Sequence, residues 1–196
     1  LYKVFSFLLS AYIEVFRSTP MMVQATVIFY GAAWAFGLRL DPVTAGMFII
    51  SINTGAYMAE IVRGGIISVD KGQFEATHSI GMTHFQSMLY VILPQAIRNI
   101  LPATGNQFII NIKDSCVLSV ISVTELFFQT KSAAGATFQT FPAYFIACVI
   151  YFVLCFSITQ ILRKLETRMD GSETYTIYGT EPVINGADTL KRGDTR

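Results

Sequence analysis

The chain of 196 residues is 53% hydrophobic and only 14% charged, with 14 Lys and Arg against 13 Asp and Glu. Soluble globular domains carry about 25% charged residues, so this chain has too few charges to cover a water-facing surface. A net charge of +1 without a basic stripe argues against a nucleic-acid partner. The composition excludes an ordinary soluble enzyme, a disordered chain and a secreted disulfide-rich protein, and it indicates an all-α integral membrane protein.

Uncharged stretches predict four membrane-spanning helices, because a bilayer core about 30 Å thick needs roughly 20 mostly apolar residues of helix. The spans are expected at residues 20–38, 43–66, about 100–128 and 142–162. The third is the least regular, since it holds Lys113 and Asp114 near its middle. Residues 1–16 precede the first span, and we expect them to form a cytoplasmic interfacial helix or its continuation.

Residues 67–98 are expected to form a loop of two short amphipathic helices that do not span the membrane. The first opens near Gly72 and closes at Gly81, a residue suited to a left-handed cap. Thr83 and Gln86 have the spacing of a capping box that starts the second helix. Its apolar residues follow at helical spacing along one stripe: Phe85, Met88, Leu89, Ile92 and Leu93. Such a loop either packs on its own bundle or fits a groove on a soluble partner.

Loop charges orient the chain, because cytoplasmic loops carry an excess of Lys and Arg. Basic residues flank one side of the predicted bundle, namely Lys71, Arg98, Arg163, Lys164 and Arg168, whereas Arg39 and Lys131 fall on the other. The loop at 67–98 and the C-terminus are therefore expected to be cytoplasmic. Residues 169–196 are more polar, and we expect a disordered cytoplasmic tail after a transmembrane domain at residues 1–168.

The loop also carries a motif that resembles the cytoplasmic EAA loop of ABC importer permeases. That pattern is Glu-Ala-Ala, three residues, Gly, nine residues and Ile-x-Leu-Pro. The matching residues here are Glu75, Ala76, Thr77, Gly81, Leu93 and Pro94. Thr77 stands where the pattern has its second Ala, and Val91 where it has Ile.

Other segments are similar to the polar amino acid subfamily of these permeases. They are residues 14–24 with Arg17-Ser18-Thr19-Pro20, residues 57–65, Gly72-Gln73 and residues 113–126. Ser18 stands where the subfamily has Gly. The chain thus resembles, over about residues 11–168, the MetI-like permease subunit of a polar amino acid ABC importer.

The resemblance implies a bundle of five spans, of which four are visible, so we expect the chain to begin inside a longer protein. It also implies a second permease subunit, alike or different, two cytoplasmic ATP-binding subunits that carry ATP and Mg, and an extracytoplasmic amino-acid-binding protein. The EAA residues, with Gly72 and Gln73, would couple this chain to the ATPase. The implied function is import of a polar amino acid across the cytoplasmic membrane, with glutamine or glutamate favoured.

The residues themselves indicate no catalytic, cofactor or metal site in this chain. It has no Gly-x4-Gly-Lys-[Ser/Thr] phosphate-binding loop, and His78 and His84 are expected on different helix faces. The three cysteines, Cys116, Cys148 and Cys155, have no metal-ligand spacing. We expect a transport subunit rather than an enzyme. The alternative is an ATP-independent secondary carrier or channel, whose intramembrane charges would be ion sites.

Polar residues within the predicted spans are candidates for a substrate path. They are Gln24, Asn53, Tyr57, Glu60, Lys113 and Asp114. Each also has a structural interpretation, since such groups join helices and Glu60 has an arginine one turn on. Asn53 and Tyr57, four residues apart, share a helix face. Lys113 and Asp114 point about 100° apart, so they cannot both face one narrow site.

Overall fold

The structure is a computed structural model that describes residues 2–169, and this range contains helices and no β-strand. In chain order the elements are α1 (Tyr2–Ser18), α2 (Met21–Phe36), α3 (Pro42–Ile67), α4 (Lys71–Ser79), α5 (His84–Ser87), the π-helix η1 (Met88–Ile92), α6 (Leu93–Asp114), the 3-10 helix η2 (Ser115–Ile121), α7 (Leu126–Thr137) and α8 (Thr140–Met169). The tail expected at 169–196 lies outside the described residues from residue 170 onward.

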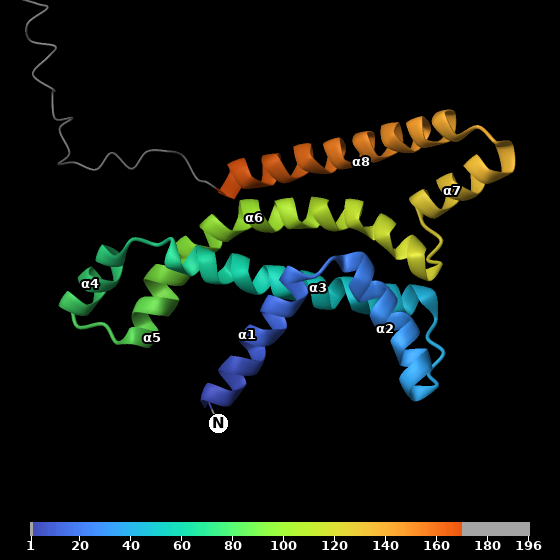
Figure 1. Ribbon diagram of the computed structural model, residues 1–196. Helices are drawn as coiled ribbons and strands as arrows, with labels where there is room; N and C mark the ends of the chain where they lie inside the picture. The colour runs from blue at the N-terminus through green and yellow to red at the C-terminus, as the bar shows by residue number, and fades with distance from the viewer. Residues whose placement is uncertain (1, 170–196) are drawn as a thin grey trace, which may run out of the picture.

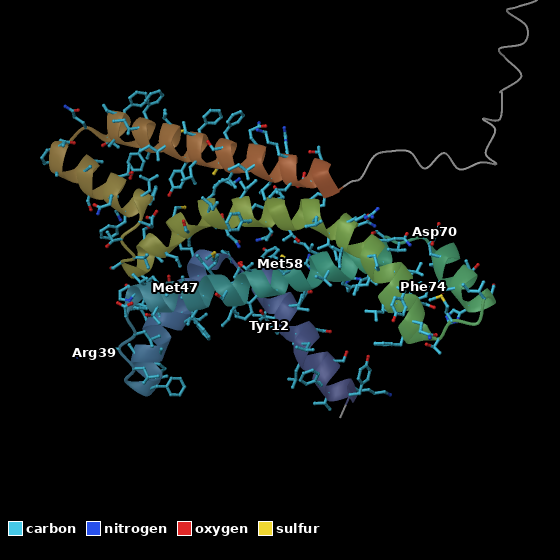
Figure 2. The ribbon with its side chains drawn as sticks, turned by 180° about the vertical axis from the view of Figure 1, so that it is seen from behind. Tyr12, Arg39, Met47, Met58, Asp70 and Phe74 are labelled. Carbon is cyan, nitrogen blue, oxygen red and sulfur yellow. The ribbon has the colours of Figure 1, made fainter. Side chains whose placement is uncertain are left out.

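Three long helices, α3, α6 and α8, run alongside one another, with α1 and α2 diverging from α3 on the side away from α8 (Figure 1). The α4–α5 segment protrudes at one end of this layer. Asp70 and Phe74 mark that end, and Arg39 lies at the opposite end of α3 (Figure 2). The loop expected at residues 67–98 and the basic residue expected on the other side of the membrane are therefore at opposite ends of the bundle.

The boundaries of α2 and α3 follow from short-range signals in the sequence. Pro20 precedes the first residue of α2, and Gly37 ends that helix in the left-handed conformation with φ 66°. Asp41 caps α3, because its carboxylate accepts hydrogen bonds from the Thr44 backbone N–H at 3.0 Å and the Thr44 hydroxyl at 3.1 Å. The backbone hydrogen bond from Thr44 is the main reason that the pKa of Asp41, which lies outside the spans, is lowered.

Small residues allow α3 to lie close to α6 and η2. A Cβ at Gly46 would lie 2.9 Å from Cδ1 of Leu118, and one at Gly65 would collide with Cγ1 of Ile100. These two contacts show that α3 and the α6–η2 unit are antiparallel. Two buried apolar clusters fill the contact, one made of Ala25, Ala45, Ile49, Leu118 and Ile121, the other of Val69, Ile92 and Ala96.

The four expected spans correspond to α2, α3, the α6–η2 unit and α8. Among the described helices, two are both long and apolar enough to cross a membrane, Pro42–Ile67 and Thr140–Thr167, so the structure supports two of the four spans by this measure. Met21–Phe36 is a shorter apolar helix, and α6 does not meet the measure. The boundaries expected for the third span were wrong at both ends. Helix η2 stops at Ser122, which is left-handed with φ 66°, and α7 then begins as a separate helix.

Glu125 is the reason that the third span does not run on to residue 128. Its carboxylate accepts hydrogen bonds from the backbone N–H groups of Phe127 at 2.7 Å and Phe128 at 2.5 Å. These groups belong to the first turn of α7, where backbone donors have no partner within the helix. The same carboxylate accepts a hydrogen bond from the Tyr151 hydroxyl at 3.1 Å, which joins α7 to α8.

The protruding segment confirms two of the expected helix signals. Gly81 has φ 81° between α4 and α5, and Thr83 and Gln86 form both hydrogen bonds of the capping box. The expected opening near Gly72 is shifted to Lys71, because the Asp70 carboxylate accepts the Gly72 backbone N–H at 2.6 Å as the N-terminal cap of α4.

The second helix of this segment differs from the expected short amphipathic helix. It continues without a break from α5 through η1 into α6, so it is the start of a long helix rather than a separate short one. The single apolar stripe was also wrong, since Met88 and Ile92 pack inward whereas Phe85 and Leu89 are 73% and 41% exposed. A π-helical turn holds more residues than an α-helical turn, so η1 shifts the side-chain register partway along.

Candidate functional site

A cavity of about 470 Å³ lies where the corner between α1 and α2 meets α3 and α6. We call it the corner cavity, and the corner is residues 17–21. Polar residues from three elements line it: Arg17, Ser18 and Thr19 on the corner, Asn53 and Tyr57 on α3, and Gln107 and Asp114 on α6. The cavity therefore exists only where these elements come together, at the level of the middle of α3.

The corner forms because Pro20 interrupts the helical hydrogen-bond pattern, and Gln24 satisfies the backbone groups that this break leaves free. The Gln24 side-chain amide donates to the carbonyl oxygens of Phe16 and Thr19, both at 2.9 Å. Its Oε1 accepts a hydrogen bond from Nδ2 of Asn53 at 2.9 Å. Both amide side chains are buried, so this chain of hydrogen bonds attaches the corner to α3.

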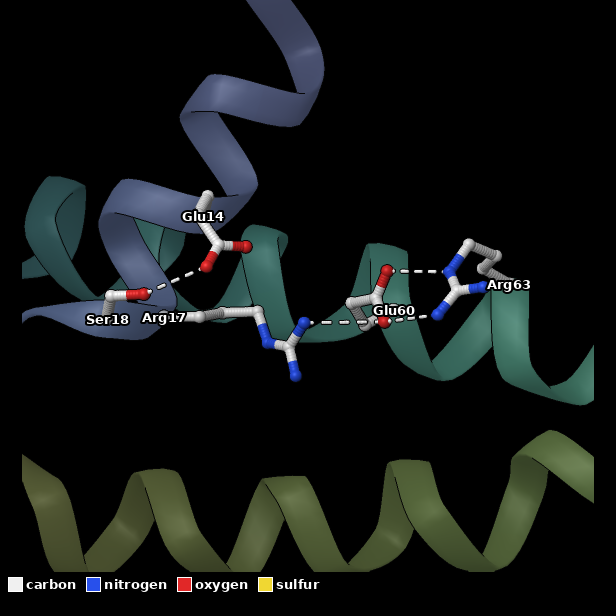
Figure 3. A network of polar contacts seen from close by, with 5 residues as sticks. All are labelled: Glu14, Arg17, Ser18, Glu60 and Arg63. Carbon is white, nitrogen blue, oxygen red and sulfur yellow. Dashed lines mark hydrogen bonds and ion pairs between the residues drawn. The ribbon is translucent and has the colours of Figure 1, made fainter.

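Three charged side chains form a network beside the cavity (Figure 3). Arg63 contacts both carboxylate oxygens of Glu60, with Nε at 2.7 Å and Nη2 at 2.8 Å. Arg17 approaches the same carboxylate from the corner, with Nη1 3.3 Å from Oε2. The guanidinium carbon of Arg17 also lies 6.0 Å from the centre of the Tyr57 ring. One carboxylate thus has two guanidinium partners, and of these three charged residues Arg17 alone is part of the cavity lining.

The six residues expected along a substrate path occupy different positions. Asn53, Tyr57 and Asp114 line the corner cavity. Gln24 supports the corner from behind, and Glu60 contacts Arg17. Lys113 lines a second cavity of about 620 Å³ between α6 and α8, together with apolar residues and cysteines. Adjacent Lys113 and Asp114 therefore face different cavities, as their angular separation on a helix predicts.

Sequence reasoning missed Arg17 and Gln107 as cavity residues. Arg17 lies just before the first predicted span, where it begins the Arg-Ser-Thr-Pro motif at the helix break. Gln107 is an amide within a predicted span, and its side chain donates to the Asn111 side chain at 3.0 Å. An amide side chain within a predicted span can be recognised in the sequence as a candidate polar site. That the Gln107 side chain lines the corner cavity depends on how α6 packs against the corner.

The residues of the EAA-like motif lie on the protruding α4–α5 segment and the start of α6. Glu75 and Ala76 are exposed on α4, whereas Thr77 is buried and donates its hydroxyl to the Phe74 carbonyl oxygen at 2.8 Å. Ile80 is 77% exposed and Phe85 73% exposed, on either side of Gly81. Gly72, Gln73 and Pro94 are also exposed and Leu93 is half-buried. The segment thus presents apolar side chains at one end of the bundle.

Comparison with known proteins identifies the family. The sequence pattern described as "Binding-protein-dependent transport system inner membrane component" matches residues 1–171. The chain belongs to this family. It is therefore a transport subunit of the inner membrane and a permease of an ABC importer, and the MetI-like resemblance of the sequence is confirmed. Within residues 2–169 no group of three or more His, Cys, Asp or Glu residues could hold a metal ion.

Relatives of known function and solved structures agree with this assignment. The chain is 42% identical over 159 residues to the glutamine transport system permease protein GlnP of Escherichia coli. The aligned region covers 81% of this chain and 73% of the relative. The crystal structure of an amino acid ABC transporter with histidines matches with a TM-score of 0.77 and 46% identity, over 81% of this permease and 74% of the solved chain. The inward-facing MetNI methionine ABC transporter matches with a TM-score of 0.68 at 18% identity, over 82% and 73% of the two chains, which supports the fold alone.

Proposed function

We propose that this permease moves a polar amino acid through the corner cavity, with glutamine as the first candidate substrate. The observation that carries the proposal is the composition of the cavity wall, which contains one guanidinium, from Arg17, and one carboxylate, from Asp114, on different helices. A free amino acid is a zwitterion, so it presents one group of each opposite charge. The volume of the corner cavity, about 470 Å³, is in the range of roughly 300–1,000 Å³ that small-molecule sites have.

Neutral hydrogen-bonding groups on the same wall favour an uncharged polar side chain. Asn53 and Gln107 offer amides and Tyr57 offers a hydroxyl. Buried groups of this kind discriminate by hydrogen bonding, because a substrate that leaves them unpaired binds more weakly. The match to a glutamine permease supports an amide side chain, while the likeness to a transporter solved with histidines supports the wider class of polar amino acids.

Membership of the family supports the partners that we propose for this permease. Two ATP-binding subunits, which carry ATP and Mg, would contact the exposed α4–α5 segment through the face that holds Glu75 and Ala76. A second permease subunit, identical or different, would complete the path, and an extracytoplasmic binding protein would deliver the amino acid. In this arrangement the α4–α5 segment and the C-terminus would lie in the cytoplasm, with residues 1–168 as the transmembrane domain.

Uptake by the complete transporter in proteoliposomes tests the proposal. We expect glutamine to accumulate only with ATP on the side of the α4–α5 segment, and Asp114→Asn to reduce uptake strongly because the ammonium loses its charged partner. Lys113→Gln is the matched control, since Lys113 lies next in sequence but lines the other cavity. Uptake driven by an ion gradient without ATP would instead identify a secondary carrier.

A further inference from the structure

Glu60 is paired unequally with its two arginines. Arg63 makes two short contacts with the carboxylate, at 2.7 and 2.8 Å, whereas Arg17 makes a single longer one at 3.3 Å. Two-point guanidinium–carboxylate pairs are stronger and more rigid than single contacts. The Arg17 contact is therefore the weaker of the two (Figure 3). Of the two arginines, Arg17 is the one that lines the corner cavity.

Loss of the Arg17 contact would not leave the half-buried Glu60 carboxylate without a partner. Glu60 would remain paired with Arg63, which avoids the large cost of an isolated carboxylate inside a membrane protein. The three side chains carry two positive charges and one negative charge, so the network has one positive charge in excess. Of its two guanidinium groups, Arg17 is the one that lines the cavity, and it is 39% exposed.

We propose that Arg17 binds the α-carboxylate of the transported amino acid, and that Glu60 is a positioning residue that holds Arg17 while the cavity is empty. When the amino acid enters, Arg17 exchanges the carboxylate of Glu60 for that of the substrate, and Arg63 keeps Glu60 neutralised. This inference rests on the proposed function, because it assumes that the corner cavity is the substrate site. It adds two roles to that function: Arg17 binds the substrate carboxylate, and Glu60 competes with the substrate for Arg17.

The exchange has a structural consequence for the bundle. In the empty cavity the Arg17–Glu60 contact joins the corner to a point on α3 seven residues before its last residue, Ile67. The α4–α5 segment starts only four residues after the end of α3. Substrate binding would thus remove one connection between the corner and the end of α3 nearest the α4–α5 segment. The Gln24–Asn53 hydrogen bond would still hold the corner against α3.

Equilibrium binding to the complete transporter in lipid nanodiscs, without the binding protein, tests the exchange. The two probes are glutamine and glutaminamide, which differ only in that a carboxamide replaces the α-carboxylate. For Arg17→Gln we expect glutamine to bind about tenfold or more weakly and glutaminamide to be nearly unaffected, since a charged hydrogen bond is lost for one probe alone. Arg17→Lys should recover part of the loss because it keeps the charge.

Glu60→Gln removes the competing carboxylate, so glutamine should bind several-fold more tightly while the affinity for glutaminamide stays the same. Glu60→Asp, which shortens the reach towards Arg17, should act in the same direction if the first variant does not fold. Glu14→Gln is the matched control, because Glu14 is an exposed acid of α1 that accepts a hydrogen bond from Ser18 at 3.3 Å. It should change neither affinity.

The outcomes separate this inference from the function on which it rests. If glutamine does not bind to the wild-type transporter at all, the proposed substrate is wrong. If glutamine binds and Arg17→Gln weakens both probes equally, the site stands and the carboxylate assignment to Arg17 fails. Weaker glutamine binding in both Glu60 variants, with Arg17→Gln behaving as expected, would show that Glu60 assists the substrate rather than competing with it, and would overturn the exchange.

Discussion

The side-chain amide of Asn53 on α3 donates a hydrogen bond to Oε1 of Gln24 on α2 at 2.9 Å, and both residues are buried. Through Gln24 this bond extends to the carbonyl oxygens of Phe16 and Thr19 at the break between α1 and α2. The corner is therefore stabilised by one amide that replaces the missing helical donors. Its position relative to α3 sets the position of Arg17 and Thr19 in the cavity.

Gln24→Leu should destabilise the permease by about 1–3 kcal/mol, because two carbonyl oxygens and the Asn53 amide lose their partner in a buried place. Thermal unfolding in detergent, followed by loss of the folded fraction, measures the effect. Gln129→Leu is the control, since Gln129 is an exposed glutamine on α7. Equal stability of the two variants would contradict a structural role for Gln24.

Gly81 tests whether the bend between α4 and α5 is required for coupling. Its φ is 81°, and a Cβ at this position would meet nothing within 4 Å, so a substitution is strained by the backbone alone. Gly81→Val should lower ATP-dependent uptake to about a tenth or less without preventing insertion, because a β-branched residue disfavours this conformation. Asparagine tolerates the left-handed region, so Gly81→Asn should keep much more of the activity. Equal uptake by both variants would show that the left-handed turn is unnecessary.

Gly64 and Gly65 offer a matched pair for the contact between α3 and α6. A Cβ on Gly65 would collide with Ile100, whereas one on Gly64 would meet nothing within 4 Å. Gly65→Ala should destabilise the folded state by about 1–3 kcal/mol through overpacking. Gly64→Ala should be neutral or slightly stabilising, because alanine is the better helix former. Urea or detergent denaturation of the two variants measures the difference, and a larger loss for Gly64→Ala would contradict the packing described here.

Asp41 gives the N-terminal end of α3 a defined dependence on pH. Its pKa is lowered in the folded state, chiefly by the hydrogen bond from the Thr44 backbone, so the carboxylate stabilises the fold at pH values above its unfolded pKa. That contribution is lost as the pH falls through the lowered pKa, below about 4. The wild type should melt at a higher temperature than Asp41→Asn at neutral pH, and the difference should shrink on acidification. A difference that is constant with pH would refute this.

Much of the α4–α5 segment was predictable because its signals are local. The left-handed Gly81 and the Thr83–Gln86 capping box depend on residues within one turn of each other, and both appear as expected. The different orientations of Lys113 and Asp114 likewise follow from the geometry of one helix. The apolar stripe after Thr83 failed because periodicity assumes a constant helical pitch, and the π-helix η1 changes that pitch.

Composition and short-range patterns were enough to predict the membrane class, the helical bundle, the EAA-like motif and the family, since each depends on composition or on residues close together in the chain. Which polar groups share a cavity depends instead on how the helices pack in three dimensions. Arg17 lies 36 residues before Asn53 and 97 before Asp114 in the chain, yet all three line one space. The small residues at the α3–α6 contact set how close these helices come, and the Gln24–Asn53 bond sets where the corner crosses them. Such distances between helices depend on side-chain packing, which no local pattern in the sequence records.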